Sequence, residues 1–576
     1  LRELRWRSAG VTVASFAYAL SPYLINYGAR ISVILLPFAG LPWLIGLAAR
    51  SLRRNDWRTP ALFALVTLTV GGVNATSLLL VMVAPMMWFI YATFIEREVS
   101  FVRALKTAGK ITLLTVITSI WWVVGLLTQG AHGIPILRYT EAYETVANAA
   151  LAPELLRGLG YWFFYGTDGL GPWTQASRAY IESPLLISLS FAIPLLAVAA
   201  AVLTRFRHRI FFASVVLVGL VIGVGAHPWD SPSPYGGIFK AFTQGDLGLS
   251  FRSTPRAVPL IALGLAVFLG AAIAALSAWR PTWHRFAAGA LLLLICLNQL
   301  PLFQGLMVDR NLDRKEDVPE YWLQAADALD AGDVDTRVLE VPGTDFASYR
   351  WGNTVDPITP GLTDREYAAR ELIPYGSPAS ANFLNDFDLP FQSGRVEPSA
   401  IAPLARLLGV GDILLRADLQ QERFRTPRPR VTFEQLKEAP GIDPFAQFGA
   451  VVANTPTEQL PLDDELEFNT PSTAPDPAPV TLFRVQDSRP ILRTVQAQGP
   501  TLLAGNAAGL VNFAASGGLQ VDRPIFYSAS FTADPSALES QISEPDSELI
   551  VTDTNRKQAR RWGAVRDNDG YTERVG

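Results

Sequence analysis

Two arginines stand four residues apart where an apolar run begins. The stretch "LGLSFRSTPRAVPLIALGLAVFLGAAIAAL" (247–276) places Arg252 and Arg256 ahead of a run long enough to cross a bilayer. A guanidinium near a bilayer is costly unless it snorkels, pairs or lines a polar cavity, and its planar fork of donors fits phosphate oxygens. If the helix starts early, both cations lie on one face at its N-terminus, which attracts an anion. The pattern predicts a phosphate site, with snorkelling or pairing to Asp246 and Asp230 as the alternative.

Other polar residues fall at the same expected end of the helices. Arg30, in "SPYLINYGARIS", is a third candidate phosphate ligand, with interfacial anchoring as the alternative. Four residues are candidates to line a substrate cavity: Tyr23, Asn26, His227 and Trp229. For His227, in "HPWD", a capping and turn role is the alternative.

The catalytic base stays open at this stage. A general base must lie within hydrogen-bond reach of the proton that it takes, and a sequence does not show that reach. The weak candidates are the carboxylates Glu141, Glu144 and Asp230, and Asp168 and Asp246 share the same expected side.

Several other chemistries lack their residues. The chain has no Walker-type phosphate loop, no His/Cys zinc spacing and no GxSxG motif. With four histidines and one cysteine, Cys296, inside an apolar run, we expect no disulfide and no metal-site residues. No cofactor is predicted, and a divalent cation is left open. A net charge of -4 argues against a nucleic-acid partner.

The first half of the chain reads as a polytopic membrane domain. Mean hydropathy is +0.23 and only 17% of residues are charged. A membrane helix needs roughly 20 mostly apolar residues. The candidate segments are 9–25, 31–49, 61–73, 76–95, 111–128, 184–204, 211–226, 257–278 and 286–303.

Basic residues in the short loops predict the orientation, because Lys and Arg accumulate on the cytoplasmic side. The basic loops lie at the start of the chain and at 50–58, 96–110, 205–209 and 279–285. These five loops lie on the same side of the membrane only if residues 60–95 cross the membrane twice. We therefore expect a multi-pass plasma-membrane protein whose loops 129–183 and 227–256, and everything after 303, are extracytoplasmic.

The second half has mixed helix and strand patterns. Residues 317–331 have helical spacing, whereas 336–343, 409–416, 479–485 and 547–554 look like strands bounded by turn residues. This alternation predicts an α/β or α+β fold. The predicted domains are 1–303, a multi-spanning membrane domain; 304–487, a mixed α/β extracytoplasmic domain; and 488–576, the start of a further strand-rich extracytoplasmic unit.

Several stretches together resemble a known family. They are "YALSPYLINYGARISVILLPFAGLPWL", "SFRSTPRAVPL", "VLEVPGTDFASYRWGNTVDPITPGL", "ARELIPYGSPASANFL", "LLGVGDILLR" and "VTDTNRKQARRWG". They resemble the large actinobacterial α-(1→3)-arabinofuranosyltransferases, which branch cell-wall arabinan, and the resemblance covers essentially the whole chain.

The resemblance implies a membrane glycosyltransferase of the C-type fold. The implied donor is decaprenylphosphoryl-D-arabinofuranose, and the implied acceptor is the arabinan of arabinogalactan and lipoarabinomannan. The family's catalytic carboxylate is expected upstream of Leu1, so we expect this chain to be an internal fragment. Two other hypotheses are a lipid-linked saccharide transporter or flippase, and a non-catalytic membrane scaffold that binds wall glycan.

Overall fold

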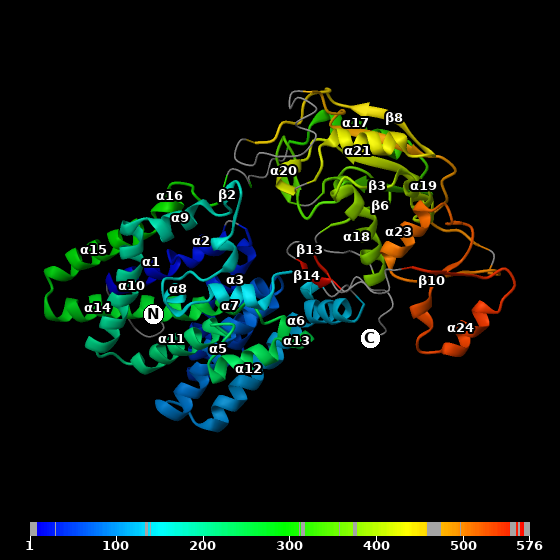
Figure 1. The fold of residues 1–576 in the computed structure, drawn as a ribbon. Helices are drawn as coiled ribbons and strands as arrows, with labels where there is room; N and C mark the ends of the chain where they lie inside the picture. Colours follow the sequence, from blue (N-terminus) through cyan, green and yellow to red (C-terminus); the bar gives the residue numbers. More distant parts are fainter. Residues whose placement is uncertain are drawn as a thin grey trace. The chain divides into compact units, whose positions relative to one another are not determined.

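The computed structural model describes most of the chain. The described residues are 9–28, 30–132, 136–138, 140–309, 312, 317–355, 357–371, 377–424, 426–457, 474–495, 497–552, 560–562 and 565–568. They form two compact units, one of Leu1–Gly133 with Ala142–Arg310 and one of Ile134–Glu141 with Asn311–Gly576. Each unit is described by itself (Figure 1).

The first unit is built from apolar helices. Its main helices are α1 (Ala9–Ala19), α3 (Leu35–Arg53), α4 (Arg58–Gly71), α5 (Ala75–Ile90), α6 (Phe101–His132), α10 (Pro184–Leu203), α11 (Arg209–Val224), α14 (Val258–Trp279) and α15 (Trp283–Asn298). Five helical stretches are long and apolar enough to cross a membrane: Ser32–Arg53, Ala75–Ile95, Phe101–His132, Pro184–Leu203 and Thr254–Trp279. The helices α4, α11 and α15 are shorter but also apolar. Eight of the nine predicted segments overlap one of these helices, and the remaining segment, 9–25, overlaps the 11-residue helix α1.

Helix α14 forms the centre of this unit. Its residues are buried almost continuously from Val258 to Ala271, and it packs on α1, α10, α11 and α15. Small residues permit the close approach that packing between membrane helices requires. A Cβ at Gly270 would lie 2.5 Å from the Gly10 carbonyl oxygen of α1. A larger residue at this position would separate the two helices.

Three of the basic loops, 50–58, 96–110 and 205–209, lie together at one end of the helices. Arg103 Nη2 donates to the Arg53 carbonyl at 2.6 Å, and Arg207 pairs with Glu96 at 3.2 Å. These contacts join three of the basic loops. The stretch 60–95 forms two helices, α4 and α5, that both pack on α3, as two crossings require.

The second unit contains a five-stranded sheet in the order β6-β3-β7-β9-β8. Its strands are β3 (Arg337–Val341), β6 (Tyr367–Ala368), β7 (Val410–Arg416), β8 (Ile442–Phe448) and β9 (Val480–Val485). Strand β3 is parallel to β6 and β7, and β9 is antiparallel to β7 and β8. All residues of β7 are buried, which is typical of a strand covered on both faces.

Helices and further strands complete this unit. The helices around the sheet are α17 (Glu320–Asp330), α18 (Pro378–Gln392), α19 (Pro398–Leu407) and α21 (Pro429–Glu438). The predicted helix 317–331 and the predicted strands 336–343, 409–416 and 479–485 are confirmed within a few residues at each end.

The region after residue 488 contains a second, parallel sheet. Its order is β11-β10-β12, with strands β10 (Thr501–Ala504), β11 (Ile525–Tyr527) and β12 (Glu548–Val551) and helices α23 (Ala507–Ala515) and α24 (Pro535–Ile542). Helix α23 packs on α18 and α19, and its apolar side chains join the core of the first sheet. Strands and helices alternate here, and a two-stranded sheet of β13 (Arg560–Trp562) and β14 (Val565–Asn568) follows; the strand-rich unit stays a prediction. The domain boundary at 487/488 stays a prediction.

Candidate functional site

The loops at the end opposite the basic residues pack on one another. We call this region the loop end and define it as residues 20–31, 71–76, 142–183 and 225–257. Thr76 Oγ1 donates to the Ser250 carbonyl at 3.0 Å, and Asn26 Nδ2 donates to the Gly158 carbonyl at 3.5 Å. The structure therefore brings the two long loops to the α4–α5 turn and to the segment after α1.

Arg256 lies in the loop end within a 3-10 turn, Thr254–Ala257, that runs into α14. Its Nη1 donates to Asn74 Oδ1 at 3.4 Å, and the same oxygen caps α5 by accepting from the Ser77 amide at 2.9 Å. Its Nε is buried without a hydrogen-bond partner among the described residues. Its charge also acts on the hydroxyl of Tyr23. The guanidinium is thus held in place while keeping donor capacity for a ligand.

Tyr23 and Asn26 come from the short helix α2 (Tyr23–Gly28). Both side chains are buried, and in the part of the chain described here Tyr23 OH and Asn26 Oδ1 have no hydrogen-bond partner. Gly158, at φ +84°, is pressed against this segment, since a Cβ there would lie 3.3 Å from the Tyr23 amide nitrogen. Buried polar groups without partners are costly. We call Tyr23, Asn26 and Arg256 the loop-end polar cluster.

Arg252 does not share a helix face with Arg256, contrary to the expectation from their spacing. Helix α14 begins at Val258, and Arg252 precedes the 3-10 turn. Its side chain is buried, and Nη1 donates to the Leu249 carbonyl of its own loop at 3.1 Å. Pro255 occupies the 3-10 turn, so the helix does not start early enough to align the two arginines.

Arg30 lies against aromatic side chains. Its guanidinium is 5.2 Å from the centre of the Phe163 ring, a cation–π distance. The Phe163 ring stacks on the Tyr161 ring. The Tyr161 ring in turn stacks on Tyr27, with ring centres 4.4 Å apart, and the ring centres of Tyr27 and Tyr23 are 4.7 Å apart. A chain of rings thus leads from Arg30 to the loop-end polar cluster.

His227 and Trp229 hold two loops together. His227 Nδ1 lies 3.0 Å from the Ala147 carbonyl oxygen, and the Trp229 ring meets Tyr143 edge-on at 5.5 Å. Lys240 Nζ sits 4.0 Å above the Trp229 ring and donates to its carbonyl. These contacts favour the structural alternative for His227.

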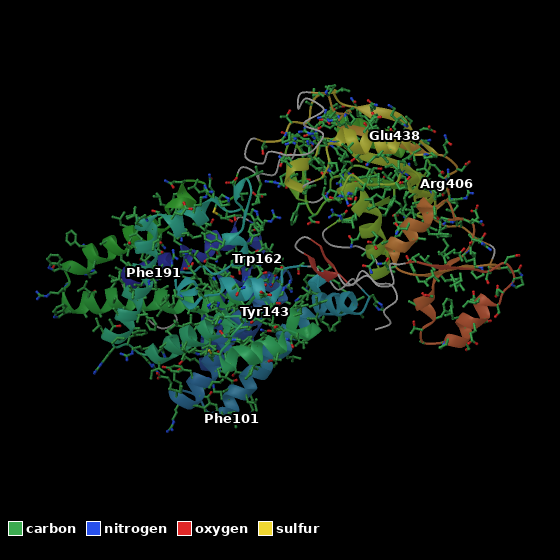
Figure 2. All side chains as sticks on the ribbon, in the orientation of Figure 1. Phe101, Tyr143, Trp162, Phe191, Arg406 and Glu438 are labelled. Atoms are coloured by element: carbon green, nitrogen blue, oxygen red, sulfur yellow. The ribbon has the colours of Figure 1, made fainter. Side chains whose placement is uncertain are left out.

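Tyr143 is the centre of this loop contact. Figure 2 labels it together with Trp162, which packs against the same small apolar cluster. The Tyr143 hydroxyl accepts a hydrogen bond from the Ala226 amide at 3.0 Å, and burial raises the pKa of Tyr143 to about 12. Gly225, at φ +53°, leaves room for that hydroxyl, because a Cβ there would lie 2.6 Å from it.

Two of the three candidate bases, Glu144 and Asp230, have no partner among the described residues that would mark them as catalytic. Glu144 is exposed in the first turn of α7 (Tyr143–Ala149), and Asp230 is exposed in its loop. Neither makes a hydrogen bond or ion pair with a described residue, and Glu141 belongs to the second unit. Within the described ranges, no three His, Cys, Asp or Glu side chains are grouped to hold a metal ion. The base stays open.

A buried ion pair in the loop end was not predicted from the sequence. Arg157 Nη1 donates to Glu154 Oε1 at 2.6 Å, Nη2 to the Tyr180 carbonyl at 2.7 Å, and Nε to Ser190 Oγ at 2.9 Å. Tyr165 OH donates to Glu154 Oε2 at 2.5 Å. The i,i+3 spacing of Glu154 and Arg157 is the sequence signal that could have found it. All three donor nitrogens of Arg157 are used, so this pair positions the loop and does not await a ligand.

Comparison with known proteins gives relatives over nearly the whole chain. Residues 2–575 match the family model described as alpha-(1->3)-arabinofuranosyltransferase, N-terminal GT-C domain. The chain is 27% identical over 495 residues to the alpha-(1->3)-arabinofuranosyltransferase of Mycolicibacterium smegmatis, covering 82% of this chain and 33% of that protein. It is 28% identical over 489 residues to that of Mycobacterium tuberculosis, covering 80% and 34%.

Solved structures show the same fold. The cryo-EM structure of the arabinofuranosyltransferase AftD from mycobacteria matches with a TM-score of 0.70 at 19% identity, covering 98% of this chain and 39% of that one. Its R1389S mutant, class 2, matches with a TM-score of 0.72 at 21% identity, covering 99% and 41%. The chain spans about a third of the length of the curated relatives. The family match, which covers essentially every residue, shows that the chain belongs to the alpha-(1->3)-arabinofuranosyltransferases, in their N-terminal GT-C domain.

Proposed function

We propose that the chain is part of a membrane enzyme that transfers D-arabinofuranose from decaprenylphosphoryl-arabinofuranose to arabinan. The product is an α-(1→3) branch in arabinogalactan or lipoarabinomannan. Family membership and the names of the relatives support this activity. Because the chain spans about a third of those relatives, the activity is proposed for the longer protein that contains it.

The loop-end polar cluster is the observation that carries the donor site. A polyprenyl phosphate presents its charge at the bilayer surface, at the depth where the apolar helix α14 begins. Arg256 is proposed to bind a phosphate oxygen there, since arginine forms charge-assisted hydrogen bonds to phosphate. Tyr23 OH and Asn26 Oδ1 would then bond ligand hydroxyls. Arg30 adds positive potential, and Arg252 supports the loop.

The loop end is proposed to face away from the cytoplasm. Three of the basic loops lie together at the opposite end of the helices, and the positive-inside rule assigns that end to the cytoplasm. Helix α15 runs back from the basic end, so the second unit would be extracytoplasmic. A lipid-linked sugar and a wall polymer would meet on that side.

The test is donor kinetics of the full-length enzyme with Arg256→Gln. One lost charge-assisted hydrogen bond costs about 1.5–3 kcal/mol, so we expect the KM for donor to rise about tenfold to a hundredfold. Arg285→Gln, an exposed arginine at the basic end, is the matched control. Release of polyprenyl phosphate with sugar transfer separates a transferase from a flippase. Unchanged donor kinetics in Arg256→Gln would remove the proposed donor site.

A further inference from the structure

A separate cleft lies in the second unit, along the edge strand β6. It has a volume of about 590 Å³, within the range typical of small-molecule sites. Its walls come from β6, α18, the end of α19, α23 and β11, and α18 and α23 pack side by side (Figure 1). The cleft therefore spans both sheets of the unit and is formed by elements far apart in the sequence.

One wall of the cleft is apolar and aromatic. Phe383, Leu407 and Leu510 line it, together with the rings of Tyr367 and Tyr527. Flat rings and aliphatic surface pack against the C–H faces of a ligand, and the Tyr367 hydroxyl donates to Glu371 Oε1 at 3.2 Å. This wall suits a ligand that has both apolar faces and polar edges.

A buried amide supplies the polar contact. Asn385 of α18 is 8% exposed and lines the cleft, yet its side chain makes no hydrogen bond with any residue that the structure describes. An amide offers two donors and an acceptor, and those of Asn385 are not among the side-chain atoms buried without a partner, so they reach the open cleft and are available to a ligand. Glu366, exposed at the rim of the cleft, adds acceptors. A hydroxyl group, which both donates and accepts, satisfies the two together.

The charges in the cleft disfavour an anionic ligand. Arg370 is committed to ion pairs with Asp388, at 3.1 Å, and with Asp345. Arg337, whose Nη1 donates to the Leu408 carbonyl, is then the remaining cation in the lining, against two carboxylates, Glu366 and Glu371. The lining therefore carries no surplus positive charge to attract a phosphate or a carboxylate.

We propose that this cleft binds a neutral saccharide chain, namely a segment of the arabinan acceptor. The saccharide class follows from the amphipathic wall, the unpaired amide and the lack of surplus positive charge. Its identity as arabinan rests on the proposed function. The cleft would hold the acceptor chain on the second unit, while the loop-end polar cluster binds the lipid donor.

The test is calorimetric titration of the 576-residue chain in detergent with an arabinofuranosyl oligosaccharide, and with maltohexaose as comparator. The variants are Asn385→Leu, which removes the amide at similar volume, and Glu366→Gln, an exposed substitution that leaves the fold intact. Asn512→Leu, exposed on α23, is the matched control. Loss of one buried hydrogen bond predicts about tenfold weaker binding for Asn385→Leu, a smaller loss for Glu366→Gln and none for Asn512→Leu.

Two results would overturn the proposal: arabinofuranoside binding that both cleft variants leave unchanged, or equal affinity for maltohexaose. The Arg256→Gln variant keeps the two proposals apart, since it should impair donor use without changing saccharide binding. If Arg256→Gln leaves donor use unchanged but saccharide binding depends on Asn385 and Glu366, the proposed donor site is refuted and the cleft proposal is supported. If transfer depends on Arg256 but saccharide binding is unchanged in the Asn385 and Glu366 variants, the cleft proposal is refuted and the donor site is supported.

Discussion

Replacing Arg157 by Gln should loosen the loop that presses on the donor site. The Arg157 side chain is 5% exposed and bonds Glu154, Ser190 and the Tyr180 carbonyl. Glutamine removes the charge and is too short to reach all three partners. The Gly158 carbonyl, one residue on, accepts from Asn26, so motion here reaches the loop-end polar cluster.

The size of the effect follows from what the substitution leaves behind. Breaking a buried ion pair by removing one partner costs about 3–5 kcal/mol. The Glu154 side chain is 18% exposed and keeps the hydroxyl of Tyr165, so its charge can still be solvated. We therefore expect Arg157→Gln to cost about 3 kcal/mol, the lower end of that range. This cost corresponds to a shift of about a hundredfold in the equilibrium for local opening of the loop.

Hydrogen exchange measured by mass spectrometry on the chain in detergent reports this opening. The informative amides are those of Arg157, Gly158 and Gly160, which bond the Pro153 carbonyl, the Leu155 carbonyl and the Tyr165 hydroxyl. Local opening exposes these amides and speeds their exchange. Arg178→Gln, an exposed arginine on α9 (Gln175–Glu182), is the control, and its exchange should match wild type. Equal protection in Arg157→Gln and Arg178→Gln would show that the ion pair does not hold the loop.

Two further predictions concern Asp418 and Gly225. Burial raises the pKa of Asp418 to about 6 from 3.8, so the folded state binds the carboxyl proton more tightly than the unfolded state. Protonation of Asp418 therefore stabilises the fold below pH 4, and this stabilisation is lost as pH rises through 6. A shift of about 2 pKa units corresponds to about 3 kcal/mol of unfolding free energy. The unfolding free energy of wild type relative to Asp418→Asn should therefore fall by about 3 kcal/mol between pH 4 and 7, as measured by urea unfolding followed by tryptophan fluorescence. A difference that stays constant over this pH range would contradict the raised pKa. Gly225→Ala should destabilise the folded chain by about 1–3 kcal/mol, because the positive φ is strained for alanine and its Cβ clashes with Tyr143 OH. The thermal unfolding midpoint should fall for Gly225→Ala but not for the control Gly289→Ala, whose Cβ would lie in open space. Equal midpoints for the two variants would refute the clash.

Local patterns in the sequence predict the elements well. The strand β7 lies inside the predicted 409–416 and the helix α17 inside 317–331, because each is specified by its own apolar spacing and by turn residues at its ends. The nine apolar segments likewise each overlap a helix. Their positions need no information from elsewhere in the chain.

The contacts of the site residues are not local. Arg256 meets Asn74, 182 positions away, and Asn26 meets Gly158, 132 positions away. No spacing rule links such pairs, so the sequence predicts the type of residue at the loop end but not its partner. The alignment of Arg252 with Arg256 was wrong for a local reason, since the turn at Pro255 is 3-10 and the α-helix begins only at Val258.

Buried charge has two different uses at the loop end. Arg157 is fully satisfied by its own chain, so a ligand there would have to displace existing bonds. Arg256 Nε, Tyr23 OH and Asn26 Oδ1 are buried without partners among the described residues, and they come from segments more than 200 residues apart. Each of these orphaned groups is costly to bury, and a polar ligand or ordered water that bonds them would remove that cost. The satisfied arginine therefore positions the loop, and the unsatisfied one is where binding energy can be gained.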